Sequence, residues 1–196
     1  MAAGLVVLAR GSGCNAADLG LDPRHLRHGL RVGGVWAGAV AAGYGIALGA
    51  PAAADVFRDD RVTSLGTTSA RAHLLLRIPL GTALAEEVAF RGVLPAMLAS
   101  PRRPAWLPGA LASLLFGLWH VLPSRDLVQR NAGLRRVLAP APRGAVVLAV
   151  GITALAGGVL QALRKRTGHL VAPFTVHLAT NVLGLLAARA SPSSEE

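Results

Sequence analysis

Six polar side chains stand inside apolar stretches of helical length, and they limit the possible folds more than any other feature of the sequence. They lie in three segments, at residues 81–98, 111–122 and 173–186, and are Glu86, Glu87, Arg91, His120, His177 and Asn181. An ionisable group at membrane depth costs about 2.5–3.5 kcal/mol on insertion scales, so such groups face a protein interior or a cavity. The pattern therefore predicts helices that gather these side chains in a buried catalytic or metal site.

The composition favours a membrane-embedded chain. Of its 196 residues, 53% are hydrophobic and 15% are charged, and the mean hydropathy is +0.49, which separates the chain from most soluble domains. The 23 glycines suit close contacts between helices in lipid. We expect an all-α fold, a polytopic transmembrane helical bundle of about five or six membrane segments around an internal polar cavity.

The apolar segments divide the chain into three parts. Residues 1–31 form a polar N-terminal segment, in which the short apolar start is interpreted as the remnant of an earlier helix and a new helix is expected near Asp22. Residues 190–196 form a disordered tail. The part between them, 32–189, is the membrane-embedded domain, in which residues 124–143 are expected to form a loop or, alternatively, an interfacial helix. Its expected spans are 32–54, 70–99, 105–122, 144–163 and 170–189.

The formal net charge of +10 is compatible with nucleic-acid binding, but the charge distribution argues against it. The basic residues flank apolar segments, for example at 102–103 and 164–166, and aromatic residues are not interleaved among them as stacking platforms. We therefore expect the lipid bilayer as a partner and no nucleic acid. The single cysteine, Cys14, excludes an intrachain disulfide. The tryptophans are expected to be interface anchors: Trp36, Trp106 and Trp119.

The two adjacent glutamates are expected to have different roles. Glu87 and Arg91 are one helical turn apart and can form an ion pair. Glu86 lies about 100° away around the helix axis, which leaves it free to act as a general base. The alternative is that both glutamates only neutralise Arg77 and Arg91.

The histidines complete the set of chemically competent groups. His120 can share a water molecule with Glu86, or it is simply a histidine at a helix end near the headgroups. His177 and Asn181 are one turn apart and can donate two hydrogen bonds to a developing oxyanion. They could instead join His120 and a glutamate in a metal site, or hold helices together as polar residues in lipid.

Three short motifs carry a resemblance to a known family. Glu86-Glu87-Val-Ala-Phe-Arg91, Phe116-Gly-Leu-Trp-His120 and His177-Leu-Ala-Thr-Asn181 resemble the EExxxR, FxxxH and HxxxN motifs of the CAAX-protease and bacteriocin-processing (CPBP, or Abi) family. These proteins are intramembrane endopeptidases related to type II CAAX prenyl proteases. Each motif alone is weak, but three in order, each on an apolar segment, are specific. The resemblance covers roughly residues 70–189.

The resemblance implies an endopeptidase that hydrolyses a peptide bond at or in the bilayer. By that analogy Glu86 and His120 hold and activate the attacking water, while His177 and Asn181 stabilise the oxyanion. The residues that support the site would be Glu87, Arg91 and Phe116.

The same resemblance bears on cofactor, substrate and location. The family is usually labelled metalloprotease, so one expectation is a divalent metal, zinc first, held by Glu86, His120 and His177; a metal-free mechanism is the other. The implied partner is a peptide or protein substrate at the membrane. The implied location is integral to the membrane, in a bacterial plasma membrane.

Two other classes of function use the same residues. A non-catalytic membrane immunity or scaffold protein would retain the motif residues as helix-packing groups. A small proton-coupled transporter would use the buried carboxylates, but it predicts an inverted repeat, and no repeat is visible in the sequence.

Overall fold

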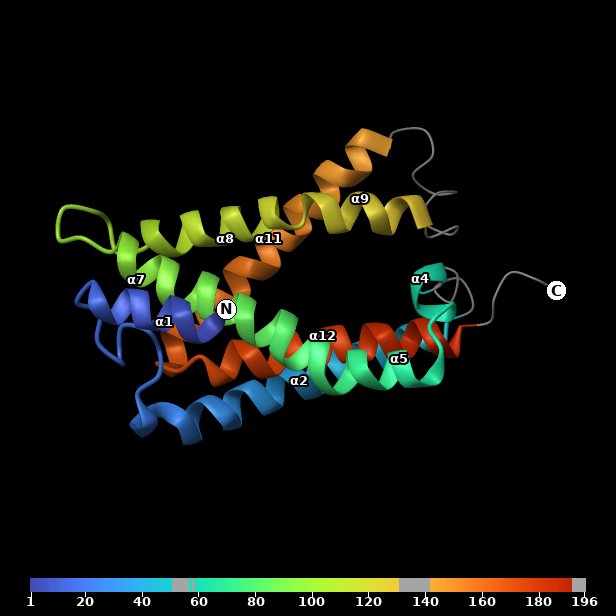
Figure 1. The fold of residues 1–196 in the computed structure, drawn as a ribbon, viewed down its shortest axis with the longest axis horizontal. Helices are drawn as coiled ribbons and strands as arrows, with labels where there is room; N and C mark the ends of the chain where they lie inside the picture. Colours follow the sequence, from blue (N-terminus) through green and yellow to red (C-terminus); the bar gives the residue numbers. More distant parts are fainter. Residues whose placement is uncertain (51–56, 58, 131–141, 192–196) are drawn as a thin grey trace.

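The computed structural model describes residues 1–50, 57, 59–130 and 142–191, and within these ranges the regular structure is helical. Figure 1 shows the course of the chain. The elements before the first motif are α1 (Ala2–Gly11), η1 (Pro23–His25), α2 (Leu26–Leu48) and α4 (Asp60–Thr63). The elements after it are α8 (Leu107–Trp119), α9 (Val121–Arg130), α11 (Pro142–Thr167) and α12 (Val171–Ala190).

A long helix between these two groups, Thr67–Leu98, carries both glutamates and is called here the central helix. It joins α5 (Thr67–Ala72), η2 (His73–Leu84), α6 (Ala85–Glu87), η3 (Val88–Val93) and α7 (Leu94–Leu98) without interruption. The winding is π-helical in η2 and η3, a form that is rare and is frequent at functional sites. The helix ends as Ala99 turns extended, in front of the prolines at 101 and 104 that block its continuation.

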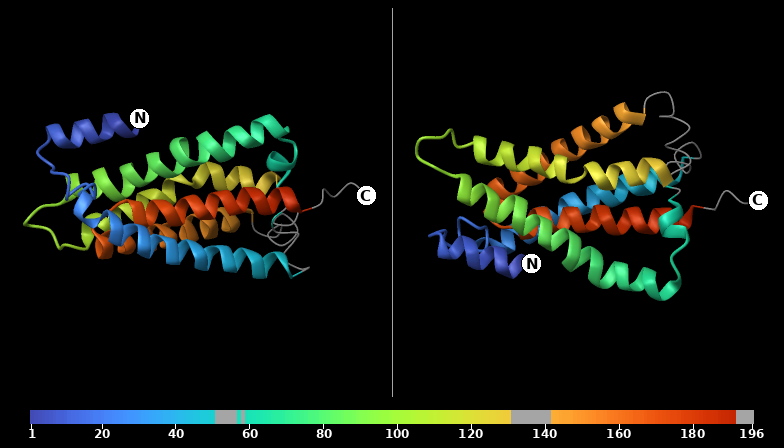
Figure 2. Two further views of the ribbon diagram at one scale, coloured as in Figure 1. Left: turned by 90° about the horizontal axis from the view of Figure 1, so that it is seen from below. Right: turned by 45° about the horizontal axis from the view of Figure 1, so that its top comes forward.

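The helices form two layers in Figure 1, with α8 and α9 above and the central helix, α12 and α2 below. Helix α11 crosses between them and packs against α8, α9 and α12. In the lower layer α12 packs against α2 along its length and against η2 of the central helix, and both views of Figure 2 show α2 and α12 side by side. The three motif-bearing segments therefore meet where the layers approach each other.

The N-terminal segment packs against the back of the central helix. Helix α1 contacts η3, and a cluster of buried apolar side chains joins them: Ala9, Leu19, Val88, Val93 and Leu170. The connection to α2 is fixed by Arg164 of α11, whose Nη2 donates to the carbonyls of Ala17 and Asp18, each at 2.9 Å. Gly20 has a φ of +72°, and any Cβ there would collide with the Arg164 guanidinium.

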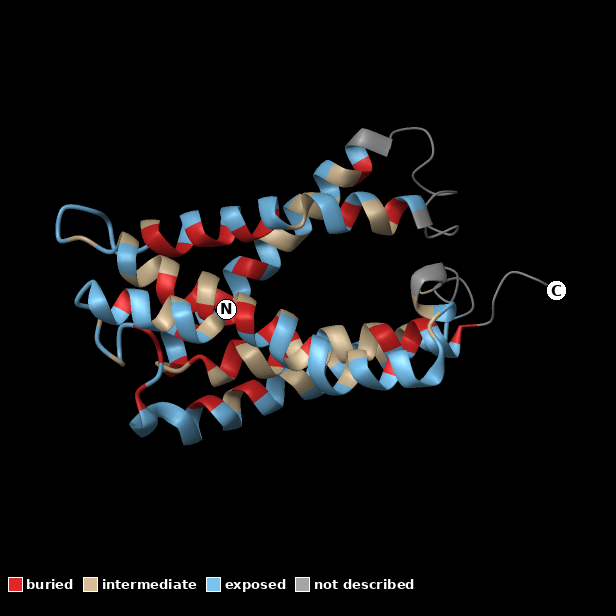
Figure 3. Cartoon of the chain, viewed as in Figure 1, coloured by how far each residue is buried: buried red, intermediate tan, exposed pale blue. Residues whose placement is uncertain are grey.

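Three helical segments of the described chain are long and apolar enough to cross a membrane: Leu107–Gln129, Gly144–Thr167 and Val171–Ala190. Figure 3 shows exposed residues along the outward faces of α8 and α11, and large apolar side chains such as Leu118 and Leu155 are among them. Apolar outer surfaces of this kind suit lipid. The chain is an all-α, polytopic membrane bundle; α2 and the central helix are not among the three, so five or six spans remain a prediction.

The described helices differ from the expected ones chiefly at the end of α2 and in α9. The helix start expected near Asp22 is confirmed, because Asp22 is the N-cap of η1 and α2 follows from Leu26, but α2 ends at Leu48, before the expected end at residue 54. The prediction of a loop after residue 124 was wrong up to Arg130, because α9 continues from α8 and packs against α11. Three expectations fall partly outside the described residues: the end of the first span at 51–54, the loop at 131–141 and the tail at 192–196.

Candidate active site

Glu87 and Arg91 form the buried ion pair that their spacing predicts. Glu87 is fully buried and Arg91 is 2% exposed, and Oε1 of Glu87 lies 3.1 Å from Nη1 of Arg91. The same Oε1 accepts a hydrogen bond of 2.8 Å from Nδ1 of His177 on α12. The pair therefore fixes the central helix and also ties it to α12.

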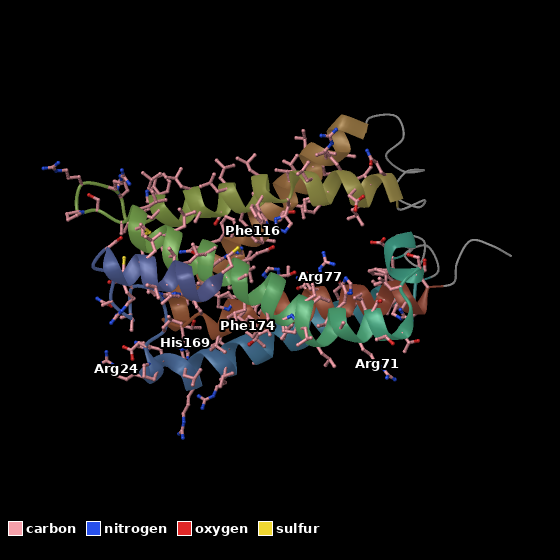
Figure 4. The ribbon with its side chains drawn as sticks, viewed as in Figure 1. Arg24, Arg71, Arg77, Phe116, His169 and Phe174 are labelled. Atoms are coloured by element: carbon pink, nitrogen blue, oxygen red, sulfur yellow. The ribbon has the colours of Figure 1, made fainter. Side chains whose placement is uncertain are left out.

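The guanidinium of Arg91 is held on its other side by an aromatic ring. Its Cζ lies 3.8 Å from the ring centre of Phe116 on α8, a cation–π contact that is strong when both groups are desolvated. Figure 4 shows Phe116 below α8, facing the lower layer. Helix α11 completes the packing with Gly157, where a Cβ would come within 3.1 Å of the Phe116 ring and 3.3 Å of Nη2 of Arg91.

Glu86 faces a different set of groups, as its position on the helix predicts. Its Oε2 lies 3.9 Å from Nε2 of His120 and 3.8 Å from Nε2 of His177. That oxygen is buried and makes no hydrogen bond within the described residues. The central helix, α8 and α12 thus bring Glu86, His120 and His177 together around one point, as one shared site requires.

The hydrogen bonds of the two rings determine which nitrogen carries a lone pair. Nδ1 of His120 donates to the carbonyl of Phe116 at 2.8 Å, and Nδ1 of His177 donates to the Glu87 carboxylate. Both partners can only accept, so in the neutral rings each Nε2 is an acceptor. Two imidazole lone pairs and the Glu86 carboxylate therefore converge, and such a trio binds a water molecule, a proton or a cation.

A break in the helix places His120 at this point. α8 ends at Trp119, and His120 adopts φ −88° and ψ 5°, outside the helical range. Pro123 lies four residues beyond Trp119 and has no N–H that could donate to the Trp119 carbonyl. The His120 amide donates to the Gly117 carbonyl at 3.0 Å, three residues back rather than four. The proline explains why the helix is interrupted at His120, beside the glutamate.

Asn181 lies one turn beyond His177 on α12, but the structure does not join it to the trio. Within the described residues its side chain makes no hydrogen bond to the site, and it is half-buried at the wall of a cavity of about 870 Å³. Thr82 of η2, one turn before Glu86, also lines this cavity, as does Arg77. Figure 4 shows Arg77 projecting between the central helix and α9. The cavity therefore begins one helical turn from the trio, whose own side chains do not line it, and lies toward α4 and α9.

The side chains of the trio are of the types that bind a metal, but the distances between them do not match a metal site. Histidines that bind a metal through Nε2 and donate from Nδ1 to a carbonyl or carboxylate are the usual arrangement. Ligands of a tetrahedral zinc, however, lie about 3.4 Å from one another, closer than the 3.8 and 3.9 Å here. Within the described ranges no group of three His, Cys, Asp or Glu side chains is spaced to hold a metal ion.

Sequence reasoning missed two contacts of the site. The bond between His177 and Glu87 joins residues 90 positions apart, and no local pattern signals it. Trp119, expected at a membrane interface, donates from its indole Nε1 to Oε1 of Glu86 at 3.3 Å. In the expected span 105–122 Trp119 stands three residues from the end, so the sequence pattern did not separate it from an interface anchor; only the helical span Leu107–Gln129 places it further inside.

Comparison with known families identifies the chain. Residues 68–183 match the family model described as type II CAAX prenyl endopeptidase Rce1-like, a match over more than half of the chain. The protein therefore belongs to this family of membrane proteases, which confirms the resemblance carried by the three motifs. Neither the curated proteins nor the solved structures include a match.

Proposed function

We propose that the protein is an intramembrane endopeptidase that hydrolyses a peptide bond through a water molecule activated by Glu86 and His120. The observation that carries the proposal is the convergence of Glu86 Oε2 with two histidine Nε2 atoms at 3.8 and 3.9 Å. These separations are too long for direct hydrogen bonds and suit a bridging water. Membership of the family supports protease chemistry at this site.

In the first step the water attacks the scissile carbonyl carbon. Its oxygen forms the new C–O bond, and one of its protons passes to Oε2 of Glu86, with the His120 Nε2 lone pair orienting the water through its second proton. The carbonyl π electrons move to oxygen and give a tetrahedral oxyanion. Glu86 then returns the proton to the leaving amine as the C–N bond breaks.

The oxyanion needs donors, and His177 and Asn181 are the candidates. The Glu87 carboxylate that accepts from Nδ1 of His177 also stabilises the ring as an imidazolium, in which Nε2 becomes a donor. The Asn181 amide, at the cavity wall, supplies the second donor once substrate occupies the cavity.

A metal-assisted variant uses the same side chains. Glu86, His120 and His177 would hold the ion, with zinc the first choice for two imidazoles and a carboxylate. Its contribution when bound would be to activate the water and polarise the carbonyl as a Lewis acid. The positions of Glu87 and Phe116 as acceptors for the two Nδ1 atoms would then fix the ligands' orientation.

The substrate enters through the 870 Å³ cavity, whose polar and apolar walls suit an extended peptide. The name of the family points to proteins with a prenylated C-terminal CAAX sequence, and processed bacterial peptides are the other substrate class. The bacterial plasma membrane is the proposed location.

The test compares new peptide termini in membranes from cells that carry the wild-type protein or Glu86→Gln. Loss of a general base lowers rates about 10²–10⁴-fold, so termini produced by the wild type should be absent with the variant, while expression and the unfolding temperature stay unchanged. A farnesylated reporter ending in a CAAX sequence, added to the same membranes, distinguishes the two substrate classes. Inhibition by a zinc chelator, reversed by added zinc, would establish the metal-assisted variant.

The same experiment decides against the proposal if the termini are identical in both membranes. With both proteins equally abundant and folded, that result would favour the non-catalytic immunity or scaffold protein, in which the motif residues only pack helices. The buried pair of Glu87 and Arg91 would serve either function, so it is Glu86 that discriminates.

A further inference from the structure

Trp119 occupies a position in the membrane segment that an interface anchor does not need. It lies near the middle of the span Leu107–Gln129, whereas Trp106 directly precedes that span. Tryptophan anchors gather at the two membrane–water interfaces, where the ring is in lipid and the N–H reaches water. At mid-span the indole N–H must find an acceptor within the protein or lose a hydrogen bond.

The acceptor is the candidate general base. Nε1 of Trp119 donates to Oε1 of Glu86 at 3.3 Å, while Oε2 of the same carboxylate faces the Nε2 atoms of His120 and His177. The last torsion of a glutamate side chain is broad, so a carboxylate without such a bond rotates freely. Holding one oxygen leaves the other directed at the two rings.

Trp119 is 57% exposed, and its indole ring contacts one aromatic side chain of the central helix. Its centre lies 6.2 Å from that of Phe90, which is one turn beyond Glu86 on the central helix. Phe90 in turn packs edge-on against Phe116 at 5.3 Å, and Phe116 carries the Arg91 guanidinium. The ring and the N–H of Trp119 therefore make separate contributions, one to packing and one to the carboxylate.

We propose that Trp119 is a positioning residue, whose indole N–H holds Oε1 of Glu86 so that Oε2 is presented to His120 and His177. The catalytic consequence rests on the proposed function, whereas the hydrogen bond itself does not. The two can therefore be tested separately.

The bond is tested by fluorescence in a protein with Trp36→Phe and Trp106→Phe, in which Trp119 is the sole emitter. A carboxylate beside the indole nitrogen changes the energy of its excited state, so Glu86→Ala should shift the emission maximum at fixed pH. The control is Arg125→Gln, which removes an exposed charge from the same span. An unchanged spectrum in Glu86→Ala, or an equal shift in Arg125→Gln, would overturn the proposal whether or not the protein is a protease.

The positioning role is tested by Trp119→Phe, which removes the N–H and keeps an aromatic ring. Hydrogen bonds to charged groups are worth enough for a loss of about tenfold or more. We expect that loss in kcat with KM unchanged, measured on a peptide that spans the termini found only with wild type, and less than a twofold change in Trp106→Phe. Equal rates in the two variants, both folded, would show that Trp119 only packs.

If wild type produces no specific termini, the proposed function fails, and the fluorescence comparison still decides whether Trp119 holds Glu86. If termini appear and the spectrum is insensitive to Glu86, the proposed function stands and the positioning role falls. The two failures therefore give different results.

Discussion

Glu86 and Glu87 are adjacent in sequence, and their surroundings are opposite in kind. Glu87 is fully buried and has two close partners, with His177 at 2.8 Å and Arg91 at 3.1 Å. The side chain of Glu86 is 13% exposed, and its histidine neighbours stay at 3.8 and 3.9 Å. Glu87 thus has two close partners on one oxygen, Oε1, whereas Oε2 of Glu86 faces two histidine nitrogens at distances that leave room for a water molecule.

The difference separates stability from chemistry within one turn of helix. A fully buried carboxylate with an ion-pair partner and a hydrogen-bond partner on Oε1 contributes to the fold but is poorly placed to accept a proton from substrate water. A carboxylate with a free oxygen beside two lone pairs is suited to that exchange. The comparison predicts that substitutions around Glu87 affect unfolding first, and those around Glu86 affect turnover first.

The largest effect on stability is expected from Arg91→Met, which leaves Glu87 charged and unpaired in the interior. Breaking a buried ion pair from one side costs about 3–5 kcal/mol. Thermal or denaturant unfolding in detergent measures the loss. The double variant Glu87→Gln, Arg91→Met removes both charges and should recover much of it. Equal stability of wild type and Arg91→Met would show that the ion pair of Glu87 and Arg91 does not stabilise the fold.

A smaller effect is expected from Phe116→Leu, which keeps an apolar side chain but removes the ring beneath Arg91. Desolvated cation–π contacts are worth about 2 kcal/mol, so unfolding free energy should fall by that order. The matched control is Leu115→Ala, an exposed position on the same helix, where we expect a much smaller loss. Similar losses at both positions would show that the stacking on Arg91 contributes little.

Gly157→Ala tests how closely the network is packed. The added methyl would meet the Phe116 ring and Nη2 of Arg91 at 3.1 and 3.3 Å, and overpacking costs about 1–3 kcal/mol. The neighbour Gly158 has open space around its Cβ position, so Gly158→Ala should be neutral or stabilising by up to about 1 kcal/mol. Unfolding curves of the two alanine variants measure the difference. A Gly157→Ala variant as stable as wild type would show that Phe116 and Arg91 can move to accommodate the methyl group.

The smallest effect concerns Asp22, a carboxylate outside the membrane segments that extends the comparison. Hydrogen bonds from the Arg24 side chain and backbone lower the pKa of Asp22 from 3.8 to about 2. A lowered pKa stabilises the fold above the unfolded value, and this contribution is lost as pH falls from 3.8 toward 2. Unfolding temperatures of wild type and Asp22→Asn should therefore differ at pH 5 and converge near pH 2. If the two unfolding temperatures still differ at pH 2, the effect of Asp22 comes from its role as a helix cap and not from its charge.

The sequence predicted those parts of the site that depend on local geometry. The pairing of Glu87 with Arg91 and the separate direction of Glu86 follow from positions on one helix, and both are confirmed. The helical segments were also found, because apolar runs and prolines mark them. For residues 124–130 a loop was preferred to a helix, but α9 forms there because its polar sequence is stabilised by packing on α11.

What the sequence by itself determined is the set of groups and the helices that carry them, because both follow from spacing within a few residues. Which atoms face one another was decided by tertiary structure. His177 meets Glu87 across 90 residues and Trp119 meets Glu86 across 33, and these contacts depend on how α8, α12 and the central helix cross. Since the crossing is set by side-chain packing between helices, no local pattern contains it. The different surroundings of Glu86 and Glu87 are therefore a property of the fold.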